Sequence, residues 1–369
     1  MNASIRVVST GLVYRNPSPH LRSVVAYHPS LVPGNQGDWF ATFDIGQSVE
    51  AFDYHTVSGR SRDGGESWYI EGPLLKEAPQ ATTHTIRTSR LRDQALIGFG
   101  GLFHRKDPEQ GLINRETFGF TPMDLFLVRS FDDGRSWTSP EKITPPLEGP
   151  AWEICHPIVE LKNGRWLAPT ATWRGWKGEN PSGEQTVALI SDDRGLTWPT
   201  YGCIFDGRPA ALRHLEVSVV ELDDATILAV AWAYDISTGK TLPTVSCFSE
   251  NHGETFGKPE QTDIEAQTCK LLRLADGRIL CVYRRNDKPG LWAALVDLRS
   301  RRWRTLAEEP LWLGADSGMK GRSSSADELS TLRFGYPSLQ GMPGGNVLCL
   351  FWCQEDCITN IRWLRISVE

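Results

Sequence analysis

The sequence predicts an all-β fold built from repeated antiparallel sheets, and three observations predict it. The 369-residue chain contains 34 glycines, 23 prolines and 14 tryptophans, a composition typical of many short strands and turns. One eight-residue turn sequence recurs along the chain, and one strand–turn–strand phrase occurs six times. We expect a single domain over residues 1–369, because no charge block, Ser/Gly tract or proline-rich hinge marks a linker.

The recurring turn has the pattern S-x-D-x-G-x-x-W. It occurs as "SRDGGESW" at 61–68, "SFDDGRSW" at 130–137 and "SDDRGLTW" at 191–198, with a degenerate copy, "SENHGETF", at 249–256. A weaker echo, "VDLRSRRW", ends at Trp303. The Asp can accept hydrogen bonds from backbone N–H groups of its own turn, the Gly permits a positive φ, and the aromatic ring packs on the neighbouring hairpin. We therefore expect these turns to be rigid scaffold.

The second repeated phrase consists of two short apolar strands joined by a turn. Its six copies start about 50 to 70 residues apart, at His28, His84, His156, Glu216, Cys269 and Tyr336. This spacing suits a four-stranded antiparallel blade with loops, and six such blades arranged radially protect their sheet edges. The sequence thus predicts a six-bladed β-propeller. The sixth unit has too few residues for a fourth strand. We therefore expect "SIRVVSTGLVY" at 4–14 to supply its outermost strand and close the ring.

The repeated turns resemble the Asp boxes of the sialidase (neuraminidase) superfamily. The six hairpins resemble the six-bladed propeller of the same superfamily across essentially the whole chain. The resemblance implies a glycan-active or glycan-binding protein, because Asp-box propellers occur in both kinds.

Strand direction predicts where a site would lie. The starts of the first strands and the ends of the second strands should share one rim of the propeller, while the Asp-box turns fall at the opposite face. First-strand starts place on this rim Tyr27, His28, His84, His156, His214, Glu216, Lys270 and Tyr336. Second-strand ends add Asp44, His104, Arg174, Tyr234, Asp235, Arg284, Arg285, Glu355 and Asp356. A mouth rich in His and Arg, on a chain of formal net charge −6, predicts attraction for an anionic ligand.

One hypothesis is a sialidase-like glycoside hydrolase. The resemblance implies a Tyr–Glu nucleophile pair, an Asp acid and three arginines that hold the substrate carboxylate. Tyr336 in "FGYPSL" and Glu216 in "HLEVSVVEL" occupy the places of the pair, and Asp53 or Asp44 could be the acid. The arginines differ from the family pattern: Tyr27 in "AYHPSL" holds the first position, and "ATFDIG" and "ILAVAWAYD" lack the others.

The hypothesis that the sequence favours is elimination next to the carboxylate of a uronic acid. Such a lyase needs a base, an acid for the leaving oxygen and a cation for the enolate. His84 and His104 resemble the two histidines of β-propeller polysaccharide lyases such as ulvan lyases and rhamnosyl-glucuronate lyases, and the pKa of histidine suits both proton transfers. The supporting groups would be Arg174, Arg87 or Arg285 for the carboxylate and Tyr336 or His156 for the proton transfers. A non-catalytic glycan-binding propeller is the third hypothesis.

The remaining rim residues are predicted to bind an acidic oligosaccharide or polysaccharide. They are His28, Asp44, His156, Arg174, His214, Tyr234, Lys270, Arg284 and Arg285. Trp152, Trp173 and Trp176 could stack on sugar rings under any of the three hypotheses. The longest interruption of the repeat, residues 105–123, leaves this rim, so it is either a lid over the mouth or a surface decoration.

Other functions are disfavoured by composition. The chain has no basic stripe for a phosphate backbone, and no apolar stretch reaches about 18 residues. The start, "MNASIRVVSTGLVYRNP", lacks the pattern of a secretory signal, so we expect a cytoplasmic protein. Cys353 and Cys357 form a close pair, but no second pair elsewhere in the sequence completes a zinc site, so we expect no metal and no cofactor. The oligomeric state stays open.

Overall fold

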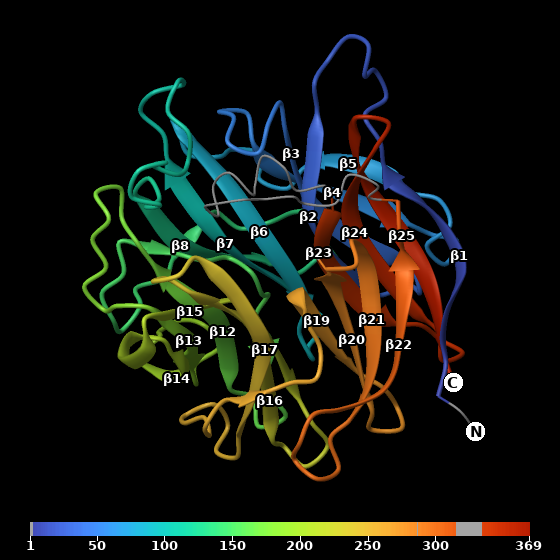
Figure 1. The fold of residues 1–369 in the computed structure, drawn as a ribbon. Coiled ribbons are helices and arrows are strands. Elements are labelled where there is room, and N and C mark those ends of the chain that lie inside the picture. Colours follow the sequence, from blue (N-terminus) through green and yellow to red (C-terminus); the bar gives the residue numbers. More distant parts are fainter. Residues whose placement is uncertain (1–2, 286, 315–333) are drawn as a thin grey trace.

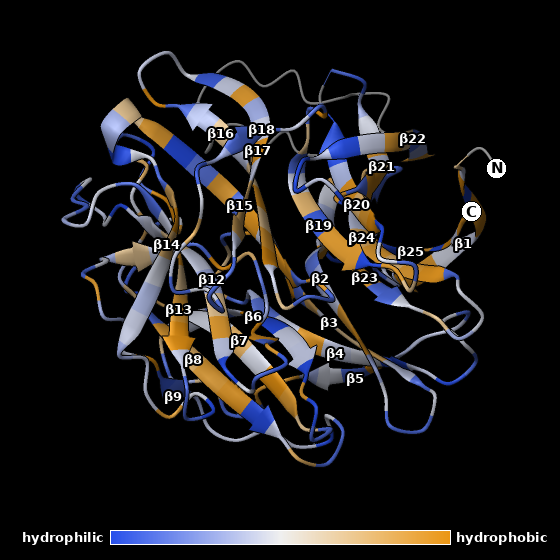
Figure 2. Ribbon diagram, turned by 90° about the horizontal axis from the view of Figure 1, so that it is seen from below, coloured by the Kyte–Doolittle hydropathy of each residue, from blue (hydrophilic) through white to orange (hydrophobic). Residues whose placement is uncertain are grey.

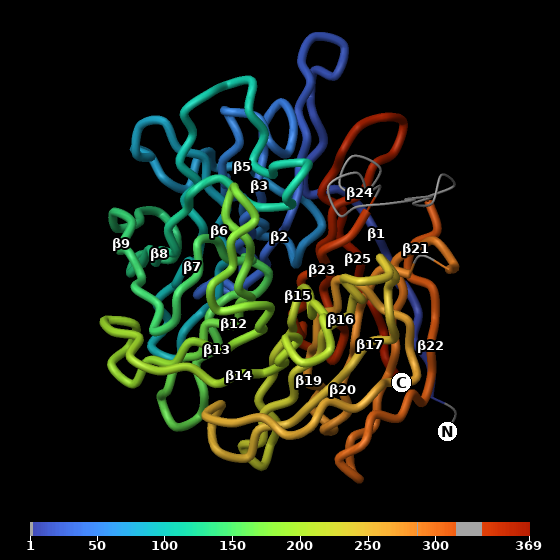
Figure 3. Tube along the Cα trace, turned by 60° about the vertical axis from the view of Figure 1, so that its left-hand side comes forward, coloured from blue at the N-terminus to red at the C-terminus, as the bar shows by residue number. Residues whose placement is uncertain are grey.

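The computed structural model describes residues 3–285, 287–314 and 334–369 and shows six antiparallel sheets arranged in a ring (Figure 1). The predicted all-β, six-bladed propeller is confirmed. Among the described residues the one helical element is a short 3-10 turn, Arg208–Ala210, and no helix is long and apolar enough to cross a membrane. Figure 3 shows the blades following one another around the ring in chain order.

The first three blades contain the following strands. Blade 1 is formed by β2 (Val25–Pro33), β3 (Trp39–Gly46), β4 (His55–Ser61) and β5 (Tyr69–Pro73). Blade 2 is formed by β6 (Thr82–Arg90), β7 (Leu96–His104), β8 (Met123–Ser130) and β9 (Glu141–Lys142). Blade 3 is formed by β10 (Ala151–Trp152), β11 (Val159–Glu160), β12 (Trp166–Trp173), β13 (Gln185–Ser191) and β14 (Thr200–Asp206).

The other three blades repeat this plan. Blade 4 is formed by β15 (Leu212–Glu221), β16 (Ile227–Asp235), β17 (Lys240–Ser249) and β18 (Glu260–Gln261). Blade 5 is formed by β19 (Gln267–Arg273), β20 (Ile279–Arg285), β21 (Gly290–Asp297) and β22 (Arg304–Trp312). Blade 6 is formed by β23 (Phe334–Gly341), β24 (Val347–Glu355), β25 (Ile358–Val368) and β1 (Ile5–Tyr14).

The two ends of the chain close the ring in blade 6. Strand β1 pairs antiparallel with β25, with Ile5 opposite Val368 and Tyr14 opposite Ile361, and the two strands lie side by side in Figures 1 and 3. The prediction that residues 4–14 supply the outermost strand is confirmed. Figure 2 shows hydrophobic residues concentrated along the strands and hydrophilic residues in the connecting loops, as expected when the faces of the blades pack on one another.

The Asp-box turn is held by hydrogen bonds within the turn. In the first copy Ser61 Oγ accepts from the N–H of Gly65 at 2.9 Å and donates to Asp63 Oδ1 at 2.9 Å. Asp63 also accepts from the N–H of Ser67 at 2.9 Å, and the indole N–H of Trp68 donates to the carbonyl of Gly65 at 3.0 Å. These bonds, those from Ser67 foremost, lower the pKa of Asp63 to about 2. The motif therefore satisfies its own polar groups and contributes structure.

The glycine of each Asp box also packs on an adjacent blade. Gly65 has φ 94°, and a side-chain carbon there would lie 3.0 Å from Leu348 in blade 6. Gly134, in the second copy, has φ 86°, and a side-chain carbon there would lie 2.7 Å from Phe40 in blade 1. Only glycine combines this conformation with so close an approach. The turns follow the third strands, so they join blades at the face opposite the first-strand starts.

We predict that Ser130→Ala lowers the free energy of unfolding by about 1–3 kcal/mol, because it leaves a buried donor without a partner. Ser130 is 1% exposed, and its Oγ accepts from the buried N–H of Gly134 at 2.8 Å. Urea unfolding measures the loss. Ser136→Ala is the matched control, because exposed Ser136 bonds Asp132 at 2.6 Å and water can replace that bond. Equal losses in the two variants would contradict the burial argument.

Candidate active site

Four innermost strands share one backbone irregularity. In β2, β15, β19 and β23 a bulge interrupts the pairing with the second strand of the blade. One residue of each bulge has a left-handed backbone, which is strained for a side chain other than glycine. These residues are His28 (φ 52°), Glu216 (φ 53°), Thr268 (φ 54°) and Tyr336 (φ 51°). Four strained residues at equivalent places around the axis mark the region as a candidate site.

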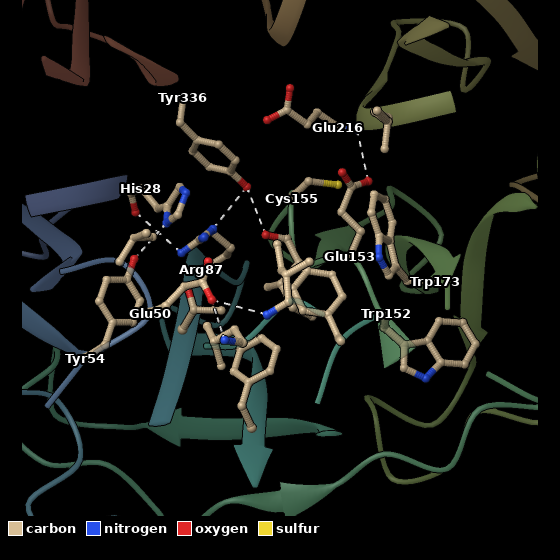
Figure 4. Close-up of a pocket in the computed structure, with 18 of the residues that line it drawn as sticks. His28, Glu50, Tyr54, Arg87, Trp152, Glu153, Cys155, Trp173, Glu216 and Tyr336 are labelled. Carbon is tan, nitrogen blue, oxygen red and sulfur yellow. Dashed lines mark hydrogen bonds between the residues drawn. The ribbon is translucent and has the colours of Figure 1, made fainter. Parts of the chain in front are cut away.

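The bulges aim their side chains at one central cavity of about 230 Å³ (Figure 4). His28, Glu216 and Tyr336 line it, and Thr268 Oγ1 donates to Glu216 Oε2 at 2.7 Å. All six blades contribute to the wall, Arg284 being the contribution of blade 5. The volume is near the lower end for small-ligand sites, which is roughly 300 Å³. Much of the wall is apolar: Phe103, Leu112, Ile113, Phe120, Trp152, Trp173 and Trp232.

Tyr336 lies buried between two cations. Its hydroxyl accepts from Arg87 Nε at 3.0 Å and donates to the carbonyl of Ile154 at 3.3 Å. The guanidinium carbon of Arg87 is 4.8 Å from the centre of the phenol ring, and Lys270 Nζ is 4.7 Å from it. Burial raises the pKa of Tyr336, although the charge of Arg87 opposes this shift. The phenol is therefore neutral at rest, and Arg87 is the group that offsets part of the cost of a negative charge on its oxygen.

Asp44 anchors Arg87 from outside the cavity wall. Its carboxylate is fully buried and accepts from Arg87 Nη1 at 3.2 Å, from Thr56 Oγ1 at 2.6 Å and from Thr85 Oγ1 at 2.6 Å. Burial by itself raises the pKa of Asp44, but Arg87, His28 and the hydroxyl donors outweigh it and hold the pKa at about 2. Asp44 is thus a permanent anion that carries no proton near neutral pH, contrary to its predicted role as the acid.

The second predicted acid also lies outside the cavity. Asp53 accepts from the N–H of Gln47 at 3.0 Å and stabilises its own loop. Neither Asp53 nor Asp44 is part of the cavity wall.

A pair of glutamates lies on the other side of the cavity. Glu216 Oε2 accepts from Trp232 Nε1 at 2.9 Å, and the backbone N–H of Glu216 donates to Glu153 Oε2 at 3.0 Å. Burial, together with the charge of Glu216, raises the pKa of Glu153 to about 7. The sequence pattern does not single out Glu153, because the repeated phrase of blade 3 starts at His156. The carboxylate three residues earlier, in "AWEICHP", is the signal that would have found it.

The two histidines predicted as base and acid do not reach the cavity. His84 alternates with Thr85 and Arg87 along β6, so its side chain lies on the opposite face of the blade, where Nε2 accepts from the N–H of Thr56 at 3.4 Å. His104 lies at the end of β7, and its Nε2 is 2.8 Å from Asp124 Oδ2. The expectation that His84 and His104 face one cavity is therefore wrong.

Other predicted binding residues also have structural partners away from the cavity wall. His156 is buried, and its Nε2 accepts from the N–H of Val219 at 3.2 Å. The ring of His214 stacks on Phe205 with 4.9 Å between centroids. The remaining three are Arg174, which pairs with Glu184 at 3.3 Å, Arg285, which pairs with Glu308 at 2.8 Å, and half-buried Tyr234. Strand ends are polar here for structural reasons, so position on the rim does not by itself predict contact with a ligand.

Three predicted binding residues remain at or directly behind the cavity. His28 lines it, and burial lowers its pKa, so the ring is neutral. Arg284 lines it and donates from Nη2 to Gln267 Oε1 at 2.9 Å. Lys270 lies behind Tyr336 and donates to the carbonyl of Cys155. Within the described part of the chain, no group of three or more His, Cys, Asp or Glu residues could hold a metal ion.

The 105–123 segment forms part of the roof of the cavity. Leu112, Ile113 and Phe120 from this segment belong to the cavity wall. Glu50 Oε2 of blade 1 accepts from the N–H groups of Leu112 at 2.5 Å and Ile113 at 3.3 Å, and the N–H of Phe120 donates to the carbonyl of Arg174 in blade 3 at 2.9 Å. Of the two predicted alternatives, the geometry favours the lid over the surface decoration.

Comparisons with solved structures agree with this architecture. A protein of unknown function from Dyadobacter fermentans is 20% identical, with a TM-score of 0.77, and the match covers 99% of both chains. The NanB sialidase of Streptococcus pneumoniae is 12% identical, with a TM-score of 0.63, and the match covers 97% of this chain and 70% of the sialidase. Trypanosoma rangeli sialidase, solved with difluorosialic acid as a covalent intermediate, is 15% identical, with a TM-score of 0.61, over 92% of this chain and 54% of the sialidase.

Sequence comparison gives the family. No curated protein matches the chain. The pattern of BNR repeat-like domains matches residues 113–349, which is more than half of the sequence. The resemblance of the repeated turns and hairpins to the sialidase superfamily is confirmed, and the chain belongs to the family of BNR repeat-like domains.

Proposed function

We propose that the protein is a carbohydrate-active enzyme, a sialidase-like glycoside hydrolase that cleaves a terminal acidic sugar with Tyr336 as its nucleophile. The observation that carries this proposal is the convergence of Tyr336, Glu216 and Arg87 on one cavity. The NanB and Trypanosoma rangeli sialidases share the fold, which supports a reaction on glycans. Fold likeness alone does not select the substrate, so the side chains of the cavity decide the rest.

The environment of Tyr336 suits a nucleophile that is neutral at rest. Glu216 lines the same cavity as Tyr336, and we assign its carboxylate as the base that takes the phenol proton. Glu216 accepts two hydrogen bonds, from Trp232 and Thr268, as an ionised base would. When Glu216 takes the phenol proton, Arg87 and Lys270 can stabilise the negative charge on the phenol oxygen.

The cations of the cavity suit a carboxylate on the sugar. Arg87 uses Nε and Nη1 for Tyr336 and Asp44, and among the described residues Nη2 makes no hydrogen bond. Arg284 supplies a second guanidinium in the wall. Because guanidinium groups bind carboxylates strongly in poorly hydrated places, the acidic group of the substrate is assigned to Arg87.

Elimination from a uronic acid has less support. The histidine pair on which it rests, His84 and His104, lies outside the cavity, and their partners are Thr56 and Asp124. A purely glycan-binding role also has less support, because binding alone does not require a buried phenol beside two cations and a carboxylate.

A substrate panel tests the proposal directly. The purified protein is incubated with methylumbelliferyl glycosides of sialic acid, deaminated sialic acid, glucuronic acid and galactose, and with uronate oligosaccharides. We expect fluorescence from an acidic glycoside, none from the galactoside, and no ultraviolet absorbance of an unsaturated uronate. An unsaturated product would establish elimination instead. Calorimetric binding of the sugars without turnover would establish a binding protein.

We predict that Tyr336→Phe lowers kcat by roughly three orders of magnitude or more, because the nucleophile is lost while the ring stays packed between Arg87 and Lys270. A difluorinated analogue of the substrate should label Tyr336 covalently, as mass spectrometry of peptides can show. Tyr54→Phe is the matched control, because Tyr54 lines the same cavity and bonds Asp44 at 3.3 Å. Label on a residue other than Tyr336 would refute the assignment.

We predict that Asp44→Asn destabilises the fold by about 3–5 kcal/mol, because it leaves the buried charge of Arg87 uncompensated. The double variant with Asp44→Asn and Arg87→Met should recover much of this loss, since neither charge remains. Urea unfolding measures both. The double variant should have a higher KM for the acidic glycoside than the wild type, because Arg87 no longer binds the acidic group, even though the stability is recovered. A stable Asp44→Asn single variant would show that Arg87 does not depend on this carboxylate.

A further inference from the structure

We propose that Glu153 is the acid/base catalyst of the cavity, the group that protonates the leaving oxygen and later activates water. This inference rests on the proposed glycoside hydrolysis. It assigns the proton transfer to blade 3 and not to Asp53 or Asp44 of blade 1, the acids that the resemblance implied.

The backbone of Glu153 is held in place from both sides. Strand β10 pairs with the end of β12 and ends at Trp152, so Glu153 is the first residue beyond the strand. Its N–H donates to the carbonyl of Ala171 at 3.0 Å, and its carbonyl accepts from Thr170 Oγ1 at 2.7 Å. The side chain belongs to the cavity wall, where Oε2 accepts from the N–H of Glu216 at 3.0 Å. Glu153 is thus fixed with its carboxyl group facing the cavity.

The carboxyl group of Glu153 faces the same space as the proposed nucleophile. The hydroxyl of Tyr336 donates to the carbonyl of Ile154, the next residue in the chain. In the view of Figure 4 the thiol of Cys155 lies between the hydroxyl of Tyr336 and the carboxyl of Glu153. A sugar ring in this cavity would have the phenol on one side and Glu153 on another, as nucleophilic displacement with proton donation requires.

The charges around Glu153 suit a proton donor. Glu216 on β15, Lys270 on β19 and the thiol of Cys155 act on it, and Arg87, Arg284 and Glu50 complete the charged wall. Burial raises the pKa of Glu153 most and the charge of Glu216 adds to it. The N–H of Glu216, the hydrogen bond with the Cys155 thiol and the charge of Lys270 lower it, leaving a pKa of about 7. Glu153 therefore holds a proton below pH 7, whereas Asp44, with a pKa of about 2, does not.

In the first step the oxygen of Tyr336 forms a bond to the anomeric carbon while the bond from that carbon to the leaving oxygen breaks. The proton of Glu153 passes to the leaving oxygen, and the phenol proton passes to Glu216. In the second step water attacks the anomeric carbon and gives its proton to Glu153. The bond to Tyr336 breaks, and the phenol oxygen takes its proton back from Glu216. The enzyme returns to its starting state, and one water is consumed for each bond cleaved.

The variant Glu153→Gln separates catalysis from support of the Glu216 bulge. The amide oxygen of Gln can still accept from the N–H of Glu216, but the amide cannot donate an acidic proton. For an alkyl glycoside of the acidic sugar, a poor leaving group, we expect kcat/KM to fall by roughly 10²–10⁴-fold. For the dinitrophenyl glycoside, which leaves without a proton, we expect a much smaller fall. Azide should raise the kcat of the variant and give a glycosyl azide, because a small anion can replace the missing base.

The pH dependence gives a second readout. Because Glu153 must be protonated to act as an acid, kcat/KM of the wild type should fall as pH rises through about 7, and this limb should vanish in Glu153→Gln. The folded pKa exceeds the ordinary 4.5, so the stability that Glu153 contributes is full below pH 4.5 and is lost as pH rises through about 7. The stability advantage of wild type over Glu153→Gln should therefore shrink over this range, which needs no substrate to measure.

The outcomes are distinguishable. An equal loss of kcat/KM for both leaving groups, with no effect of azide, would overturn the assignment and leave Glu153 as a support of the bulge. Asp53→Asn is the matched control for the alternative acid, and the leaving-group dependence in that variant would move the role to Asp53. If the wild type cleaves none of the glycosides, the proposed function itself fails, and the role of Glu153 falls with it.

Discussion

The cavity depends on the left-handed bulges of the innermost strands. In four blades a bulge turns a side chain of the innermost strand toward the axis, whereas the regular strand β6 reaches the cavity with Arg87 by alternation alone. Each strained residue costs about 1–3 kcal/mol, which the surrounding packing must offset. Ser218 and Ser338, two residues beyond the bulges at Glu216 and Tyr336, accept from the N–H groups of Leu271 and Leu31 in the next blade at 3.1 and 3.0 Å. These hydrogen bonds between neighbouring blades therefore help to keep the strained bulges in place.

Environment gives the carboxylates of this region different roles. Asp44 is surrounded by donors and lies against Arg87, so its pKa is held at about 2 and it serves as a fixed counter-charge. Glu153 is half-buried and lies beside the like charge of Glu216, so its pKa rises to about 7. Pairs of titratable groups whose surroundings drive their pKa values apart are typical of acid/base chemistry. This contrast supports the assignment of anchoring to Asp44 and proton transfer to Glu153.

The two faces of the propeller have separate tasks. The Asp-box turns satisfy their own polar groups and join adjacent blades, as the contact of Gly65 with Leu348 shows. The opposite face is shaped by bulges and by the 105–123 segment, which Glu50 and the carbonyl of Arg174 hold over the cavity. Scaffold and site can therefore vary independently, which agrees with the wide range of proteins built on this architecture.

The sequence by itself determined the six blades, the scaffold turns, the closure by residues 4–14 and the candidates Tyr336 and Glu216. These follow from repeats and strand alternation, which are local properties of the chain. Only the tertiary structure decided that His84 turns away from the cavity, that Arg87 meets Tyr336 and that Glu153 faces Glu216, 63 residues further along the chain. The reason is that no local pattern shows which face of β6 turns to the cavity or which distant residues lie beside a buried group, and the pKa of that group depends on those neighbours.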